Sequence, residues 1–348
     1  MAFLKSYVLP RFVQWLVVIF IGVTLTFIIP RLLPGDPIEQ TLRRVSANTA
    51  TDPRAVESFA NALRDMYGLQ GSPIEQYFRF WGRLLQGDLG PSLGSFPTPV
   101  TTIISSGLPW TIGLLGTSIV ISWLLGITLG TLGGYYPNRL WSQVLDKVLI
   151  TIYPIPYFIL ALLLVILFAY YIPIFPLVGG ATGRPGFTWA YITSILRHAF
   201  LPALSLVLIG TAFRYLIAKA LATRISSSNY VTYAELAGVP KRKIISRYVM
   251  RNSLLPQVTD LALSLGALFE GALITEVAFS YPGIGFQLYT AILQSDFNLI
   301  MGVTIFSIIG VATAVLIVDL LYPLLDPRPF VAAQAGKSFL IPVMGPPL

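Results

Sequence analysis

Long apolar segments separated by short polar ones run through the whole chain. A helix that crosses a bilayer needs about 20 apolar residues. Six segments are long enough: Phe12–Ile29, Leu108–Gly133, Val148–Ile172, Leu201–Leu221, Thr259–Val277 and Leu299–Leu325. This pattern predicts an all-α integral membrane protein with six transmembrane helices.

The expected spans divide the chain into four parts. Residues 1–30 hold the N-terminus and the first span, and residues 31–107 form a large loop. Residues 108–328 form a core with the other five spans, and residues 329–348 form a tail. No small-residue cleavage site follows the first span, so we expect a retained anchor rather than a signal peptide.

Composition supports the membrane assignment. Hydrophobic residues make up 55% of the chain and charged residues only 11%, whereas soluble domains carry about 25% charged residues. Disordered chains are poor in aromatic residues and rich in charge, which excludes that class as well. Cysteine is absent and His198 is the single histidine. Disulfides, thiol nucleophiles and multi-histidine metal sites are therefore excluded.

The charged residues indicate how the chain is oriented. There are 23 Lys and Arg against 15 Asp and Glu, a balance that in a soluble protein would suggest nucleic acid. Here the loop 222–256 carries six basic residues, whereas the loop 278–298 carries none. Because cytoplasmic loops of membrane proteins are rich in Lys and Arg, we predict that both termini and the loop 222–256 lie in the cytoplasm. We expect no nucleic-acid partner.

The large first loop is then extracytoplasmic. Two of its segments, Pro53–Gly68 and Pro73–Leu85, have helical patterns, and Gly87–Pro99 is rich in Gly, Ser and Pro and is typical of irregular chain.

The inner loop predicts two short amphipathic helices. Asn229 or the preceding serines can cap the first, which Gly238 ends, and Pro240 suits the first turn of a second helix that reaches about Leu254. On the second helix the basic residues Lys243, Arg247 and Arg251 share one face, and the apolar stripe contains Ile244, Ile245, Tyr248 and Val249.

Two interpretations of this loop remain open. A basic helix can lie on anionic lipid headgroups. The small residues Ala234, Ala237 and Gly238 at the bend favour instead a docking site for a cytoplasmic partner, since they let another backbone approach closely.

Several ordered motifs resemble one family of membrane proteins. The stretch Tyr230-Val-Thr-Tyr-Ala-Glu-Leu-Ala-Gly238, followed by Arg251-Asn-Ser-Leu-Leu-Pro256, resembles the EAA loop of ABC-importer permeases. More narrowly, the chain resembles the dipeptide and oligopeptide branch of these permeases, and within it the first, or B-type, subunit. Further motifs agree in order: Leu33-Pro-Gly-Asp-Pro37, Gly87-Asp-Leu-Gly90, Arg197-His-Ala-Phe-Leu-Pro202, Phe279-Ser-Tyr-Pro-Gly-Ile-Gly285 and Asp319-Leu-Leu-Tyr-Pro-Leu-Leu-Asp-Pro-Arg328.

The resemblance implies a location in the prokaryotic inner membrane and a division of labour. Such permeases form half of a pore with a second related permease, two ATPase subunits bind below, and an extracytoplasmic binding protein delivers peptides, oligosaccharides or other solutes. ATP and Mg would be bound by the ATPases and no cofactor by this chain; Val331 occupies the first glycine position that a P-loop ending at Gly336-Lys337-Ser338 requires. The implied ATPase-docking residues are Ala234, Glu235, Ala237, Gly238, Val239, Pro240, Lys241, Arg242 and Arg247.

Ionisable residues inside the spans are functional candidates. Glu270, Arg214 and Asp319 are the candidates for the translocation path. We expect Arg214 to extend to the interface or to pair with Asp319. We expect Glu270 to face the bundle interior or a water-filled path, where it either lines the pore or forms a structural hydrogen bond. Asp260 and Glu276, near the ends of the fifth span, are expected to be solvated. The expected role of His198 is capping or hydrogen bonding near Pro202 rather than metal transport.

Two other functional classes are weighed against the permease. A self-contained secondary transporter or channel predicts coupled ionisable chains or broken helices at mid-membrane. A membrane enzyme predicts a catalytic constellation, which one histidine and no cysteine can hardly supply.

Overall fold

The computed structural model describes residues 7–32, 70–266 and 273–325, together with the isolated positions 58, 61, 62, 64 and 268. Within these residues the chain is helical, and the one β-bridge joins Pro91 to Pro99. The tail 329–348, Glu270 and most of the expected helix Pro53–Gly68 lie outside the described residues.

The described helices follow one another in this order: α1 (Leu9–Leu32), α4 (Pro73–Leu85), α5 (Val100–Tyr135), α6 (Leu140–Ile152), α7 (Tyr157–Val165), the π-helix η2 (Ile166–Tyr171), α8 (Trp189–Ser226), α9 (Asn229–Leu236), α10 (Lys241–Lys243), the π-helix η3 (Ile244–Met250), α11 (Arg251–Gly266), α12 (Leu273–Ala278), α13 (Ile284–Gln294) and α14 (Phe297–Leu325).

Four described helices are long and apolar enough to cross a membrane: α1, α5, α8 and residues Phe297–Leu321 of α14. A fifth candidate is the pair formed by α6 and α7 with η2, whose two parts are bent by 98°. An all-α membrane protein is therefore confirmed, whereas the six spans stay a prediction. The expected third span is broken because Pro154 and Pro156 lack backbone donors, and the expected fifth span crosses residues outside the described part.

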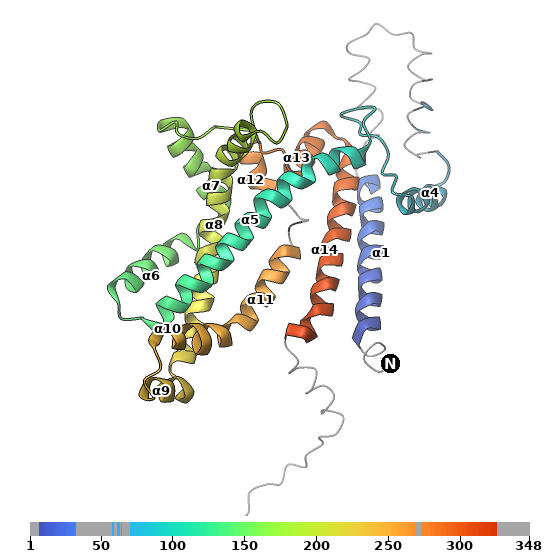
Figure 1. Ribbon diagram of the computed structural model, residues 1–348. Coiled ribbons are helices and arrows are strands. Elements are labelled where there is room, and N and C mark those ends of the chain that lie inside the picture. Colours follow the sequence, from blue (N-terminus) through green and yellow to red (C-terminus); the bar gives the residue numbers. More distant parts are fainter. Residues whose placement is uncertain are drawn as a thin grey trace, which may run out of the picture.

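The two longest helices, α5 and α8, form the most extensive helix pair and run side by side (Figure 1). Gly126, Gly130 and Gly134 recur every four residues on α5 and face α8. A β-carbon on Gly130 would lie 2.7 Å from Cβ of Ala218. Small residues at this spacing let the backbones of membrane helices approach closely.

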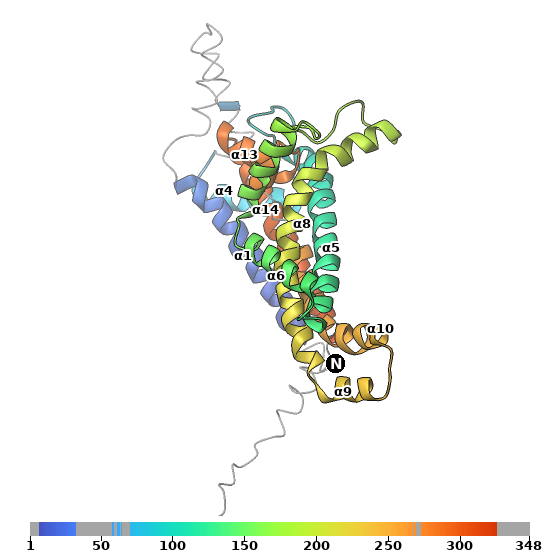
Figure 2. The ribbon, with the colours of Figure 1, turned by 90° about the vertical axis from the view of Figure 1, so that its left-hand side faces the viewer.

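The elements gather at two ends of the molecule. The helices α9 and α10 lie at the same end of the molecule as the start of α1 and the end of α14, and the helices α12 and α13 lie at the other end (Figures 1 and 2). We call these the α9 end and the α13 end. Helix α4 begins and ends at the predicted residues. Ser72 and Glu75 form a capping box that fixes its start.

The α13 end is held by two buried carboxylates. Asp296 accepts hydrogen bonds from the hydroxyl of Ser92 and from the backbone N–H of Gly94 and Leu299. Glu276 accepts one from Thr111 Oγ1 at 2.7 Å and one from the N–H of Gly285, in the first turn of α13, at 2.7 Å. Glu276 is fully buried, so the expectation that it is solvated is wrong: the turn after α12 folds α13 back over its carboxylate.

Candidate functional site

The inner loop forms a compact helical elbow, residues 229–250, which contains α9, α10 and η3. Helix α9 spans Asn229–Leu236, close to the prediction, and Gly238 follows it with φ +71°. Residues other than glycine rarely adopt this left-handed conformation. The N–H of Val239 bonds to the carbonyl of Ala234 at 3.0 Å, so the chain reverses within four residues.

One face of α9 packs against the body of the protein. Val231 and Ala234 are buried in a cluster with Ala222, Ile244 and Val249. Ala234 was expected at the centre of a docking contact, but its side chain is only 7% exposed and faces the chain's own core. A partner could therefore contact only the backbone of Ala234, since the C-terminal end of α8 covers its methyl group.

Glu235 is exposed but contacts α5. Its Oε1 accepts a hydrogen bond from the hydroxyl of Tyr135, the last residue of α5, at 2.6 Å. The predicted docking acid is thus one of the links that hold the elbow against α5.

The other face of α9 is open. Tyr233 is 69% exposed and Leu236 is 79% exposed, and next to them Ala237, Gly238 and Pro240 are exposed and Val239 is half-buried. Tyr233 and Leu236 were not among the docking residues predicted from the sequence. Their spacing of three residues, out of phase with Val231 and Ala234, is the signal that could have found them.

The basic side chains of the elbow point away from the body. Lys241, Arg242 and Arg247 are exposed, and none of them forms an ion pair within the described part of the chain. Lys243 and Arg251 are exposed as well.

The apolar stripe has a different period from the one predicted. Ile244 and Val249 are both fully buried and are five residues apart, because residues 244–250 form a π-helix. Tyr248 and Ile245 are only partly buried.

The second helix of the elbow was predicted to end near Leu254, and this prediction is wrong. It continues through η3 and α11 to Gly266, with Pro256 inside it. A proline inside a membrane helix is tolerated where neighbouring helices pack against the freed backbone. Trp123 on α5 lies beside this proline, and its Nε1 donates to the carbonyl of the next residue, Gln257, at 2.7 Å.

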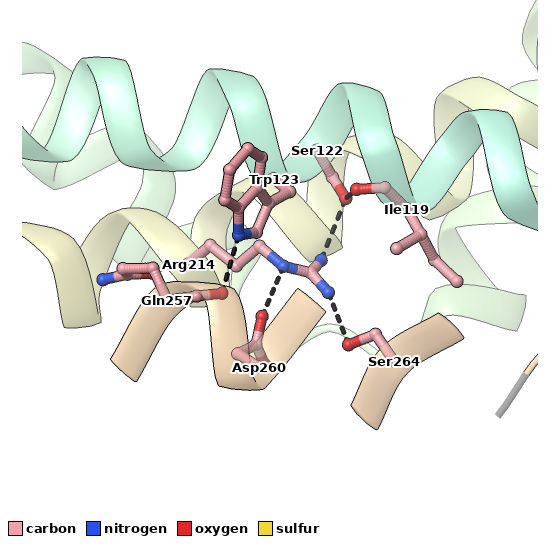
Figure 3. A network of polar contacts seen from close by, with 7 residues as sticks. All are labelled: Ile119, Ser122, Trp123, Arg214, Gln257, Asp260 and Ser264. Atoms are coloured by element: carbon pink, nitrogen blue, oxygen red, sulfur yellow. Dashed lines mark hydrogen bonds and ion pairs between the residues drawn. The ribbon is translucent and has the colours of Figure 1, made fainter. Parts of the chain in front are cut away.

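This continuous helix leads from the elbow to an ion pair in the body, in which the arginine is buried and the aspartate is partly exposed. Figure 3 shows Arg214 on α8 pointing between α5 and α11. Its Nε lies 2.8 Å from Oδ2 of Asp260, and its Nη1 and Nη2 donate to Ser122 and Ser264 at 2.9 and 2.8 Å. One guanidinium group thereby joins three helices.

Two expectations about these charges are wrong. Arg214 is buried and does not extend to the interface, because α5 and α11 cover that face of α8. It does not pair with Asp319 either: α11 packs against both α8 and α14 and lies between them. Asp319 pairs instead with Arg11 on α1, with Nη1 and Oδ2 3.3 Å apart. Asp260, expected to be solvated, is the acid that Arg214 binds.

A second polar cluster joins α6 to α8. Asp146 on α6 accepts a hydrogen bond from the hydroxyl of Tyr215 at 2.6 Å and forms an ion pair with Lys219. Both donors lie on α8, one turn apart, so the bent α6–α7 unit is tied to the same helix as Arg214.

His198 bonds within its own helix, as its expected role requires. Its Nδ1 lies 2.7 Å from the carbonyl oxygen of Ser194, one turn earlier in α8. Within the described residues, no group of three or more His, Cys, Asp and Glu side chains is placed to hold a metal ion.

Comparison with known proteins agrees with this architecture. Residues 124–331 match the family described as "Binding-protein-dependent transport system inner membrane component". The chain is 31% identical to the probable D,D-dipeptide transport system permease protein DdpB of Escherichia coli, over 90% of this chain and 94% of that protein.

Two further relatives have similar coverage. The oligopeptide transport system permease protein OppB of Haemophilus influenzae is 29% identical over 93% of this chain and 98% of its own length. The nickel import system permease protein NikB of Staphylococcus aureus is 28% identical over 94% of this chain and 92% of its own. The chain therefore belongs to the family of binding-protein-dependent transport system inner membrane components, and it is a multi-pass permease component of an ABC importer.

Proposed function

We propose that this chain forms half of a peptide-import pore and that the elbow, residues 229–250, docks on an ATPase subunit. A second related permease forms the other half. The chain crosses the inner membrane six times, with both termini and the elbow in the cytoplasm and the loop 31–107 outside. Membership of the family implies ATPase and binding-protein partners, and ATP and Mg are bound by the ATPases.

The exposed face of the elbow carries this proposal. Tyr233 and Leu236 are large, exposed apolar side chains beside exposed basic residues, while the opposite face of α9 is packed against the body. An exposed apolar contact rimmed by charge is typical of a protein–protein interface. Lipid headgroups alone would need the basic residues but not the tight reversal at Gly238.

The helix from Lys241 to Gly266 supports a route for coupling. It begins at the elbow and contains Asp260, the partner of Arg214. A displacement of the elbow by a closing ATPase would be transmitted along this helix to the ion pair. We therefore assign Arg214 to bracing three helices rather than to lining the path, and Glu270 remains the proposed path residue.

Peptides are the proposed cargo. The relatives named above include a D,D-dipeptide and an oligopeptide permease, and also a nickel permease. Ligand binding by the external protein that works with this permease would decide among peptides, oligosaccharides and nickel.

The docking proposal is tested by Gly238→Asp in the assembled importer. A β-carbon at Gly238 meets no atom within 4 Å, so the added carboxylate projects outward and opposes a closely approaching partner. We expect membrane insertion to be intact, while ATP hydrolysis no longer drives uptake. Gly87→Asp is the matched control, because Gly87 has φ +76° and equally open surroundings. Wild-type transport by Gly238→Asp would exclude the docking assignment.

A further inference from the structure

A groove of about 360 Å³ runs between α1 and α14. This volume lies within the range of about 300–1,000 Å³ typical of ligand sites. Both helices are membrane-span candidates whose surfaces are mostly exposed, so the groove opens to the lipid phase. Its walls are apolar over most of their length: Val18, Ile308, Val311, Ala312, Val315 and Leu316.

One end of the groove is polar and carries both signs of charge. Arg11 and Asp319 line it, with side chains 39% and 30% exposed, and Nη1 of Arg11 lies 3.3 Å from Oδ2 of Asp319 and 3.2 Å from Oε1 of Gln14. Among the described residues, Nε and Nη2 of Arg11 and Oδ1 of Asp319 have no protein partner. This end is the α9 end, where α1 begins and α14 approaches its last residue (Figure 1).

Trp15 marks the same boundary. Its indole lines the groove one turn from Arg11, and its Nε1 donates to Thr313 at 3.2 Å. Tryptophan is enriched at the level of lipid headgroups, where its ring is apolar and its N–H finds a polar partner. The polar end of the groove therefore lies at the depth of lipid headgroups and the apolar part at the depth of acyl chains.

We propose that this groove binds one phospholipid with a primary ammonium in its headgroup, of the phosphatidylethanolamine class. An acyl chain lies along the apolar walls, and the phosphate accepts hydrogen bonds from the unpaired N–H groups of Arg11, which suit phosphate oxygens. The ammonium donates to Oδ1 of Asp319. The negative phosphate thus faces the positive Arg11, and the positive ammonium faces the negative Asp319.

The two charges also select against other lipids. A purely anionic headgroup would bring a second negative charge beside Asp319 without an ammonium to neutralise it. A choline headgroup has a quaternary nitrogen without N–H, so it cannot donate to Oδ1. Free phosphate would leave the apolar walls unfilled.

The test uses the assembled importer in nanodiscs that contain equal amounts of phosphatidylethanolamine, phosphatidylcholine and phosphatidylglycerol. The complex is then released into mild detergent and its retained lipid is identified by native mass spectrometry. We expect phosphatidylethanolamine to be retained preferentially by the wild type. Arg11→Gln and Asp319→Asn should each lower this retention roughly tenfold, as expected for losing a charge-assisted hydrogen bond.

Three variants serve as controls. Arg11→Lys keeps the cation and should retain more phosphatidylethanolamine than Arg11→Gln. Arg139→Gln removes an exposed arginine away from the groove and should change nothing. Ala312→Trp fills the groove while leaving both charges in place, and should abolish retention. Equal retention of the three lipids by the wild type would overturn the proposal, and this measurement needs no variant that might misfold.

The alternative occupant of the groove is the second permease. The chain has no cysteine, so Val315→Cys introduces one reactive group, which carries a photo-crosslinker at the rim of the groove. Crosslinking to phosphatidylethanolamine supports the lipid site. Crosslinking to the second permease instead would overturn it.

Discussion

Arg214 on α8 and Asp260 on α11 form an ion pair whose Nε and Oδ2 atoms lie 2.8 Å apart. Ser122 on α5 binds the same guanidinium. Because α11 continues without a break from the elbow, this pair links two other helices of the body to the helix that begins at the elbow.

Loss of one member of this pair should destabilise the protein more than loss of both. Asp260→Asn leaves a buried guanidinium with a weaker partner, and breaking a buried pair in this way costs about 3–5 kcal/mol. The double variant Arg214→Met/Asp260→Leu removes both charges and should recover part of the loss. Thermal unfolding in detergent measures both effects. A double variant less stable than Asp260→Asn would contradict this account.

The contact between α5 and α8 should tolerate no side chain at Gly130. Gly130→Val forces a larger group against Ala218, and overpacking typically costs about 1–3 kcal/mol. We expect a lower unfolding temperature and reduced uptake. Gly113→Val on the same helix is the control, because a β-carbon at Gly113 meets no atom within 4 Å. If both valines lower the unfolding temperature equally, helix propensity rather than packing is responsible.

The outward face of α9 should decide how strongly the ATPase binds. Leu236→Ala removes a side chain that is 79% exposed, so the permease should keep its stability. Loss of an interface hot spot costs about 2 kcal/mol or more, roughly 30-fold in affinity. Co-purification of the ATPase subunits measures the loss.

Phe187→Ala is the control for Leu236→Ala, because Phe187 is fully exposed and lies in the segment before α8, outside the elbow. Normal ATPase recovery with Leu236→Ala, or an equal loss with Phe187→Ala, would show that this face of α9 is not the contact.

Both carboxylate oxygens of Glu276 should be required as hydrogen-bond acceptors. Glu276→Gln replaces an acceptor with an amide donor that faces the N–H groups of α13 or the hydroxyl of Thr111. An unsatisfied buried group costs about 1–3 kcal/mol, so the unfolding temperature should fall. Glu75→Gln should have little effect, since Glu75 is exposed and glutamine also completes a capping box. Equal stability of the two variants would argue against a structural role for the buried carboxylate.

Local signals in the sequence were enough to place several elements. The capping residues Ser72 and Glu75 mark the start of α4, and Gly238 marks the reversal after α9. These features depend on residues close together in the chain, because hydrogen bonds at helix ends and the left-handed conformation of glycine are local. The membrane class follows equally from the sum of apolar and charged residues.

The partners of the intramembrane charges could not be read in the same way. Depth alone made Asp319 a candidate partner for Arg214, but depth does not say which helix lies between α8 and α14. The burial of Glu276 was missed for a related reason, because its ligands come from a turn that folds back after α12 and from Thr111 on α5.

The sequence by itself determined the membrane class, the approximate positions of the four long apolar helices α1, α5, α8 and α14, the basic elbow and, through its ordered motifs, the family. Only the tertiary structure decided that Arg214 binds Asp260, that Ala234 faces inward while Leu236 faces outward, and that Arg11 and Asp319 meet at the end of a groove. Spans, caps and motifs depend on neighbouring residues and their solvent, whereas these pairings depend on which helices pack together and on the rotation of each about its own axis.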